Sequence, residues 1–383
     1  MVSIPPRDPL RRTDSVQAPE PQGRVVTRDG GAVPRSEPLV PPGGPTFASP
    51  LAFAAKPPLR ALVPAPMPDP GVVLEMRRDG PLYTMVATTN ESRDTFHIYQ
   101  ARHRDGPWTR LKDVMGKPAS IFSEAMRPKW ISTKEPDRWA PELHHLGDKW
   151  LCLYTARHLE GDLRVAVAVA DEATGPYRDL GPILTAPHGV IDATIVRDRK
   201  SGRDFMVYKN DDNAVGKPTP ILTRPFALED SGVVWLGEPH EICRSGEGHG
   251  GLLEGPWLVH EHDATWIVLS SDYYGGADYK MWIGTVDDLA HGKVDSLEHL
   301  MTSDSPCLRG EWKGPGHCSL VKEAPGIYSV YFHAWPAGTE NTSDWNQRFV
   351  GGEQRKVLRA TLAFIDERGK PCPPYIVEDR IKA

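Results

Sequence analysis

The feature that most constrains the fold of this chain is a long series of short apolar runs broken by turn-forming residues. From about residue 68, runs of four to eight apolar residues are separated by Gly, Pro, Asp and Asn. Several runs alternate apolar and polar residues, as half-buried antiparallel strands do. Helical patterns are short, since "VDDLAHGK" and "EAMRPKW" predict at most a turn or two. Clear examples of the runs are 81–89, 149–157, 163–170, 204–210, 264–271, 280–286 and 327–334.

Twenty or so short strands in one stretch favour a closed radial array. The chain has 38 Pro and 35 Gly, which supply the many turns that such an array requires. A β-sandwich would use fewer residues, and no alternation of strands with helices points to a parallel sheet. The pattern therefore predicts an all-β fold, and a β-propeller in particular.

A repeated spacing of polar residues at the start of apolar strands indicates the number of blades. Asp192, Glu254 and His317 follow one another at intervals of about 62 residues, and Asp69 precedes Asp192 by about two such intervals. The missing position falls near residue 131, a little before the segment "WAPELHHL" (139–146). The spacing predicts a single five-bladed β-propeller with four antiparallel strands per blade, over residues 46–383. The four polar residues would then surround one end of its central channel.

The remainder of the sequence narrows the class of protein. Residues 1–45 are rich in Pro, Arg and Gly without periodicity, which predicts a disordered tail. The net charge is −6 and no basic stripe is present, so we expect no nucleic-acid partner. No apolar run is long enough to span a membrane. The five cysteines are scattered, which favours reduced thiols over a disulfide framework or a zinc site.

The segment "GGLLEGPWLVHEHDATWIVLSSDYY" (250–274) predicts a β-hairpin that turns at "HEHDA". It places Glu254 at the mouth of a buried strand, just before the Gly255–Pro256 break. Two histidines in "HEHD" suggest a metal site, but no third ligand is evident and the segment falls at the turn. We therefore expect a hairpin turn there, and treat Glu254 as the candidate functional group.

The motifs at these positions, taken in order, resemble glycoside hydrolase family 43. They are "PDPGVV" (68–73), "WAPEL" (139–143), "GVIDATIVRD" (189–198), "LLEGPWLV" (252–259), "SSDYYGGADYKMWIG" (270–284) and "GPGHCSL" (314–320). The resemblance covers roughly residues 65–375 and implies a five-bladed propeller enzyme that acts on arabinose- and xylose-containing glycans. One departure is Ala193, where the family usually has Pro.

The resemblance also implies a role for each polar strand start. Asp69 matches the general base, Glu254 the general acid, and Asp192 the carboxylate that orients the acid and favours its protonated form. His317 matches the residue that helps to hold a calcium ion or a water in the channel. The resemblance implies inversion of anomeric configuration and no cofactor for the chemistry.

These residue types suit the reaction that the resemblance implies. An inverting glycosidase needs a protonated carboxylic acid on one side of the bond and, on the other, a carboxylate that activates water. The apolar neighbours of Glu254 disfavour its anion, and an ionised Asp192 would do the same. Asp69, by contrast, must stay ionised, and we expect it to be the more solvated carboxylate.

Aromatic and polar residues near the motifs are candidates for substrate binding. The candidates that would stack on a sugar ring are Trp139, Trp257, Tyr273 and Tyr274, with Trp139 preferred. Those that would bond hydroxyl groups are His144, Asn210, Asp212 and Arg355. Plain structural roles remain open: Trp139 as blade packing, His317 as a core histidine, and the three carboxylates as turn residues.

The sequence thus predicts an inverting hydrolase of α-L-arabinofuranosyl or β-D-xylosyl linkages in plant-type oligo- or polysaccharides. The segment "VYKNDDNAVGKPTPI" (207–221) looks more like the arabinofuranosidase and arabinanase branches, so we rank arabinofuranosidase first. The alternative is a catalytically silent glycan-binding propeller, which would lack one of the carboxylates. No secretory signal is evident, so we expect a cytoplasmic enzyme, or a secreted one if the start site is misassigned. The oligomeric state is left open.

Overall fold

The computed structural model describes residues 59–89, 95–135, 137–246, 251–340 and 354–380. The chain divides into two compact units, residues 1–48 and 49–383, and every described residue belongs to the second. The predicted disordered tail, residues 1–45, lies outside the described residues.

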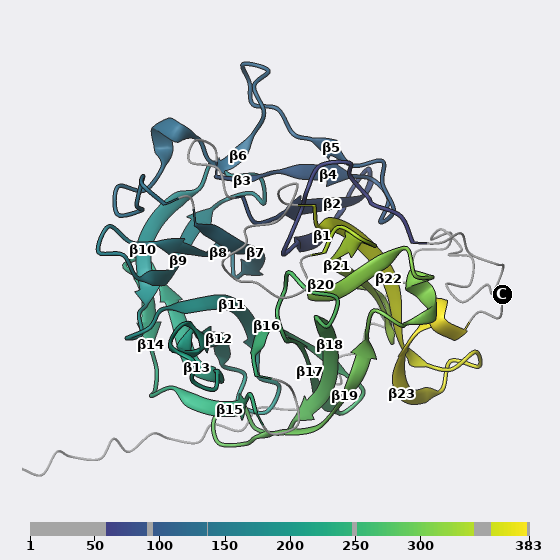
Figure 1. Cartoon of the computed structure of the whole chain (residues 1–383). Coiled ribbons are helices and arrows are strands. Elements are labelled where there is room, and N and C mark those ends of the chain that lie inside the picture. The colour runs from purple at the N-terminus through teal and green to yellow at the C-terminus, as the bar shows by residue number, and fades with distance from the viewer. Residues whose placement is uncertain (1–58, 90–94, 136, 247–250, 341–353, 381–383) are drawn as a thin grey trace, which may run out of the picture. The chain divides into compact units, whose positions relative to one another are not determined.

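The second unit is an all-β propeller of five antiparallel sheets, which we number as blades 1 to 5 (Figure 1). Blade 1 comprises β1 (Gly71–Arg77), β2 (Gly80–Val86), β4 (Tyr99–Ala101) and β5 (Thr109–Arg110). Blade 2 comprises β7 (Arg138–Leu146), β8 (Lys149–Arg157), β9 (Leu163–Ala170) and β10 (Arg178–Leu184). Blade 3 comprises β11 (Val190–Arg197), β12 (Asp204–Asn210), β13 (Pro220–Glu229), β14 (Gly232–Trp235) and β15 (His240–Arg244).

The last two blades complete the ring. Blade 4 comprises β16 (Leu253–Glu261), β17 (Ala264–Ser271), β18 (Lys280–Val286) and β19 (Val294–Met301). Blade 5 comprises β20 (Trp312–Ala324), β21 (Ile327–Pro336), β22 (Lys356–Ile365) and β23 (Pro371–Ile376). The innermost strands contact one another in a closed circle, in the order β1, β7, β11, β16, β20 and back to β1. The five-bladed prediction is therefore confirmed.

Additions to the plain four-stranded pattern explain the one displaced spacing. The strands β3 (Thr95–His97) and β6 (Ser120–Phe122) form a separate pair between blades 1 and 2, and the short 3-10 helix η1 (Glu124–Met126) follows them. This insertion moves the start of blade 2 beyond the expected residue 131. In blade 3, β15 pairs with β13 beside β14, so this sheet has five strands.

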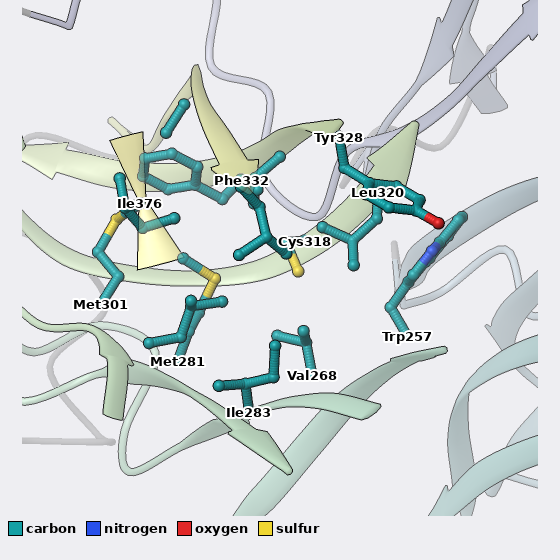
Figure 2. Packing of buried hydrophobic residues seen from close by; sticks show 14 of the residues in the cluster. Trp257, Val268, Met281, Ile283, Met301, Cys318, Leu320, Tyr328, Phe332 and Ile376 are labelled. Atoms are coloured by element: carbon teal, nitrogen blue, oxygen red, sulfur yellow. The ribbon is translucent and has the colours of Figure 1, made fainter. Parts of the chain in front are cut away.

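The hydrophobic core lies between neighbouring blades. Five clusters of buried side chains each join two successive sheets, and the cluster between blades 5 and 1 closes the ring. Figure 2 shows the cluster between blades 4 and 5, where Trp257 and Met281 face Leu320 and Phe332. The alternation read from the sequence is thus the alternation of side chains between the two faces of each blade.

Blades 1 and 5 are also joined through the backbone just before β1. The N–H of Leu62 donates to the carbonyl of Val357 at 2.9 Å, and the N–H of Met67 donates to the carbonyl of Arg355 at 3.0 Å. Within the ring, the N–H of Val72 donates to Ser319 Oγ at 3.1 Å. The two ends of the described fold are therefore tied by hydrogen bonds as well as by packing.

A left-handed residue stands at the channel end of every blade. We call these five residues the pivot residues: Asp69 (φ 53°), Ala140 (φ 43°), Asp192 (φ 56°), Gly255 (φ 55°) and His317 (φ 45°). In blades 2 to 5 the pairing with the second strand slips at this point, as in a β-bulge. Bulges redirect the side chains that follow them and are common next to active sites. Because four of the five pivots are not glycine, this strained backbone is retained against its cost.

The hairpin turn predicted for "HEHD" is present in the structure. The hairpin of β16 and β17 turns at His262 and Asp263, and the Nε2 atoms of His260 and His262 lie 2.6 and 2.9 Å from backbone carbonyl oxygens. These histidines therefore serve the fold, as the turn interpretation of "HEHD" predicts. All five cysteines are free. Within the described ranges, no helix has the length and apolarity needed to cross a membrane.

Candidate active site

The predicted catalytic carboxylates open onto one cavity at the channel end of the blades. This cavity has a volume of about 1000 Å³. Asp69 from blade 1, Asp192 from blade 3 and Glu254 from blade 4 line it, together with His317 from blade 5. The sequence spacing predicted this convergence, and the structure confirms it.

Asp69 is held as an anion by its neighbours rather than by water. Its Oδ2 accepts a hydrogen bond from Thr88 Oγ1 at 2.6 Å, and its Oδ1 lies 3.6 Å from His317 Nδ1 and 3.5 Å from an Arg355 guanidinium nitrogen. Burial alone would raise the pKa of Asp69, but the charges of His317 and then Arg355 lower it well below its usual range. Asp69 is the most exposed of the three carboxylates, as expected, but the margin is small, since its side chain is 13% exposed against 10% for Glu254 and 7% for Asp192.

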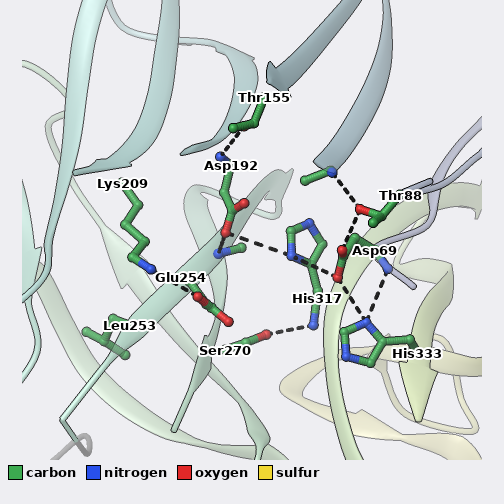
Figure 3. Close-up of polar contacts among 12 residues, drawn as sticks. Asp69, Thr88, Thr155, Asp192, Lys209, Leu253, Glu254, Ser270, His317 and His333 are labelled. Atoms are coloured by element: carbon green, nitrogen blue, oxygen red, sulfur yellow. Dashed lines mark hydrogen bonds and ion pairs between the residues drawn. The ribbon is translucent and has the colours of Figure 1, made fainter. Parts of the chain in front are cut away.

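His317 connects Asp69 with Asp192. Figure 3 shows its ring between the two carboxylates. Its Nδ1 lies 3.6 Å from the Asp69 carboxylate and 3.9 Å from that of Asp192. Burial would lower the pKa of His317, but the charges of these two carboxylates raise it. The two acidic groups on either side of the buried ring therefore favour its imidazolium form.

Asp192 and Glu254 lie together on the other side of His317 in Figure 3. Asp192 Oδ2 accepts a hydrogen bond from the N–H of Gly255 at 3.0 Å, which ties it to the residue after Glu254. Burial, together with the charge of Glu254, raises the pKa of Asp192 to about 7. Asp192 therefore titrates near neutral pH, close to the strand that carries Glu254.

Glu254 is engaged at both carboxylate oxygens by residues that the sequence analysis did not single out. Lys209 Nζ donates to Oε2 at 3.0 Å, and the Tyr279 hydroxyl donates to Oε1 at 2.8 Å. Lys209 also lies 3.2 Å from Asp211 Oδ1 and is almost fully buried. The sequence signal for Lys209 is a single cation near the end of the otherwise apolar run "DFMVYKN" (204–210).

Comparisons with known proteins identify the family of this chain. The model of glycosyl hydrolases family 43 matches residues 61–349, which is well over half of the chain. The chain belongs to glycosyl hydrolase family 43. Among curated protein sequences, no match is found.

Solved structures show the same fold at low sequence identity. A thermostable family 43 glycoside hydrolase is 21% identical with a TM-score of 0.62, and the match covers 81% of this chain and 92% of that one. An α-L-arabinofuranosidase from Lactobacillus brevis is 20% identical with a TM-score of 0.57, covering 80% and 93% of the two chains. The Bacillus subtilis arabinanase Arb43A is 17% identical with a TM-score of 0.55, covering 81% and 97%. This family 43 chain therefore shares the fold of these structures over nearly the whole described range.

A calcium ion beside His317 is poorly matched by the residues of this family 43 site. Calcium takes six to eight oxygen ligands. His317 faces Asp69 and Asp192 through Nδ1 and supplies a nitrogen rather than an oxygen ligand. Among described residues, the one group of three suitable ligand atoms is that of His158, Glu160 and Asp162, where Arg164 already binds both carboxylates. We therefore assign no chemical step to a metal.

The predicted substrate-binding residues fall into two groups. Trp139, Tyr274 and Arg355 line the cavity, and Tyr274 lies under the Arg355 guanidinium at 4.7 Å. The cavity lining does not include His144, Asn210, Asp212, Trp257 or Tyr273. Trp257 is only 8% exposed, in the core between blades 4 and 5, which favours a packing role because a buried ring cannot offer a face to a sugar.

His144 leads to another buried acid that the sequence analysis did not single out. Its Nε2 lies 3.2 Å from Glu142 Oε2, and its ring stacks on Trp257 at 5.8 Å. Burial raises the pKa of Glu142 to about 8 and lowers that of His144 to about 4. Both groups are therefore uncharged at neutral pH, and Glu142 is a structural neighbour of the catalytic cluster. Its signal lay inside the motif "WAPEL".

Proposed function

We propose that this family 43 enzyme is an inverting glycosidase that removes α-L-arabinofuranosyl units, or β-D-xylosyl units, from plant-type oligo- or polysaccharides. The observation that supports the proposal best is that Asp69, Asp192 and Glu254, from three blades, line one cavity. The solved structures that resemble the chain include an arabinofuranosidase, an arabinanase and an endo-1,4-β-xylanase, which supports the substrate class.

In the proposed reaction, Asp69 acts as general base. Its lowered pKa keeps it ionised over the whole working pH range. As a carboxylate it accepts a proton from the water that attacks the anomeric carbon, on the face opposite to the leaving group. Thr88 and Arg355 hold it in place.

Glu254 acts as general acid from the other side of His317. It gives its proton to the glycosidic oxygen while the bond to the anomeric carbon breaks and its electrons pass to that oxygen. Asp192 accepts a hydrogen bond from the N–H of Gly255, the residue after the acid, and its own pKa is raised to about 7. The silent glycan-binding alternative is disfavoured, because it requires that one of the three carboxylates be missing or displaced.

We rank arabinofuranosides first among substrates. The segment 207–221 that suggested this order includes Asp211, Asn213 and Ala214, which line the cavity. We therefore expect the region around the 3-10 helix η2 (Asp212–Val215) to contact the sugar.

The test is the turnover of an aryl α-L-arabinofuranoside, an aryl β-D-xyloside and linear arabinan. Proton NMR of the first-formed sugar should show inverted configuration. The variant Glu254→Gln should lose at least about a hundredfold in kcat/KM on substrates with poor leaving groups, and far less on a dinitrophenyl glycoside that needs no acid. Full activity of Glu254→Gln on a poor leaving group would contradict the role of Glu254.

We also propose a cytoplasmic place of action and a catalytic domain of residues 46–383 behind a tail of residues 1–45. A variant that lacks the first 45 residues should keep full kcat/KM. Cell fractionation of a producing strain tests the location.

A further inference from the structure

One position in blade 3 breaks a hydrogen-bonding pattern that the other four blades keep. In each blade, the residue just before the pivot pairs across the sheet with one residue that lies in the second strand or just after it. We call these the collar residues, and they are Thr88, Thr155, Lys209, Ser270 and His333.

Four collar residues accept a hydrogen bond from the pivot N–H of the next blade. Thr88 Oγ1 accepts from Ala140 at 2.8 Å, and Thr155 Oγ1 accepts from Asp192 at 3.3 Å. Ser270 Oγ accepts from His317 at 2.8 Å. His333 Nδ1 accepts from Asp69 at 3.2 Å, and burial lowers the pKa of His333 to about 4, so the ring is neutral and able to accept. The common function is to satisfy a buried donor at the bulge.

Lys209 cannot do this, because an ammonium group has no lone pair. The N–H of Gly255, which Lys209 would otherwise bind, donates to Asp192 Oδ2 instead. Lys209 is thereby released from the collar function, and its Nζ points to Glu254 Oε2 at 3.0 Å. The lysine at this position therefore has two effects: the Gly255 N–H binds Asp192, and the ammonium group binds Glu254. Both effects fall on Asp192 and Glu254, the proposed acid pair, which a purely structural cation would not require.

The cost of burying this cation is offset locally. Lys209 is 1% exposed and is shared between Glu254 and Asp211, whose Oδ1 lies 3.2 Å away on the cavity wall. Burial lowers the pKa of Lys209, but the charges of Glu254, Asp211 and Asp192 raise it, so the side chain stays charged. A fixed positive charge therefore lies in contact with the oxygen that carries negative charge after the acid has given up its proton.

We propose that Lys209 is a positioning residue for the general acid, which stabilises the Glu254 carboxylate as it forms and whose effect is set by competition with Asp211. The proton moves from Glu254 to the glycosidic oxygen, and Lys209 remains protonated throughout. This inference rests on the proposed function of Glu254 as the acid. The charged or titratable groups that face Lys209 and Glu254 are Asp69, Asp192, Asp211, Tyr279 and His317.

The test compares Lys209→Met and Lys209→Arg with the wild type on aryl glycosides of graded leaving-group acidity. Lys209→Met should lose at least about tenfold more kcat/KM on poor than on good leaving groups, and Lys209→Arg should recover most of that difference. The alkaline limb of the kcat/KM profile should move up in Lys209→Met by about one to three pH units, since an opposite charge within 4–6 Å has an effect of that size.

A second variant keeps the proposal falsifiable if Lys209→Met folds poorly. Asp211→Asn removes the competitor and leaves Lys209 to Glu254, so the alkaline limb should move down, opposite to its direction in Lys209→Met. Equal losses on all leaving groups together with an unmoved alkaline limb in both variants would overturn the proposal.

The role of the acid itself is tested separately. If Glu254→Gln shows the leaving-group pattern and the Lys209 and Asp211 variants do not, the inference about Lys209 fails alone. If Glu254→Gln lacks that pattern, the proposed function fails first.

Discussion

Replacing Glu142 with glutamine should make the protein more stable than the wild type, and the difference in the free energy of unfolding should grow as the pH rises. Glu142 is 4% exposed and its pKa is raised by burial to about 8, whereas an exposed glutamate titrates near 4.5. The folded protein therefore keeps a proton on Glu142 that the unfolded chain releases above pH 4.5. This contribution to stability is fully present below pH 4.5 and is lost as the pH rises towards 8.

The structure sets the size of this effect. At about 1.4 kcal/mol per pH unit, the interval between pH 4.5 and 8 corresponds to about 5 kcal/mol. The pKa of about 8 already includes the opposing influences of Thr194 and His317. Glutamine has nearly the same shape, stays neutral at every pH and can donate to His144 Nε2 in place of the carboxyl proton.

The assay is urea unfolding of wild type and Glu142→Gln at pH values from 5 to 8.5. The free energies of unfolding should be similar at pH 5 and should diverge by several kcal/mol in favour of the variant at pH 8. Glu172→Gln, at an exposed site, is the matched control and should follow the wild type. Parallel curves for Glu142→Gln and wild type would refute the assignment of a buried neutral acid.

Two further changes test the interpretation of the packing and of the buried cation. Trp257→Ala should lower the free energy of unfolding by about 3 to 5 kcal/mol, because the ring fills the core between blades 4 and 5. The KM should be nearly unchanged. A large rise in KM without a loss of stability would instead indicate that Trp257 binds the sugar. His317→Asn, which suits a left-handed backbone, should lower the melting temperature most between about pH 4 and 6.5. The raised pKa of His317 stabilises the fold fully below about pH 6.5 and less as the pH rises through its folded value, and the lowered pKa of Asp69 stabilises it less as the pH falls below about 4, where the unfolded chain takes up the proton. A difference that is constant with pH would contradict the ion pairs.

The sequence allowed the fold and the three carboxylates to be predicted because both follow from local patterns. Strand alternation and turn residues define the blades, and the polar residue that opens an inner strand lies at a bulge where its side chain must turn towards the channel. Ala140 escaped the spacing because an inserted strand pair delays blade 2. In three blades a proline follows the pivot residue directly, as in Asp69–Pro70, Ala140–Pro141 and Gly255–Pro256. This proline is the sequence signal that would have identified Ala140 as the pivot of blade 2.

The partners of the carboxylates could not be predicted in the same way. Whether Lys209 faces the channel or the neighbouring blade depends on the register between β11 and β12, which slips at the bulge. The same slip in β16 turns Trp257 away from the cavity and into the core. The alternation of a strand cannot be carried across such a point without knowledge of which residue is bulged out.

The position of Asp69 beside the closure of the ring affects when activity can arise during synthesis. Of its polar side-chain partners, Thr88 belongs to the start of the fold, whereas His317 and Arg355 belong to the last blade. A chain emerging from the ribosome can bring Asp192 and Glu254 together from blades 3 and 4 while Asp69, the proposed base, still lacks the groups that fix its charge and direction. The enzyme therefore becomes competent only when its final blade has been translated and has met the first.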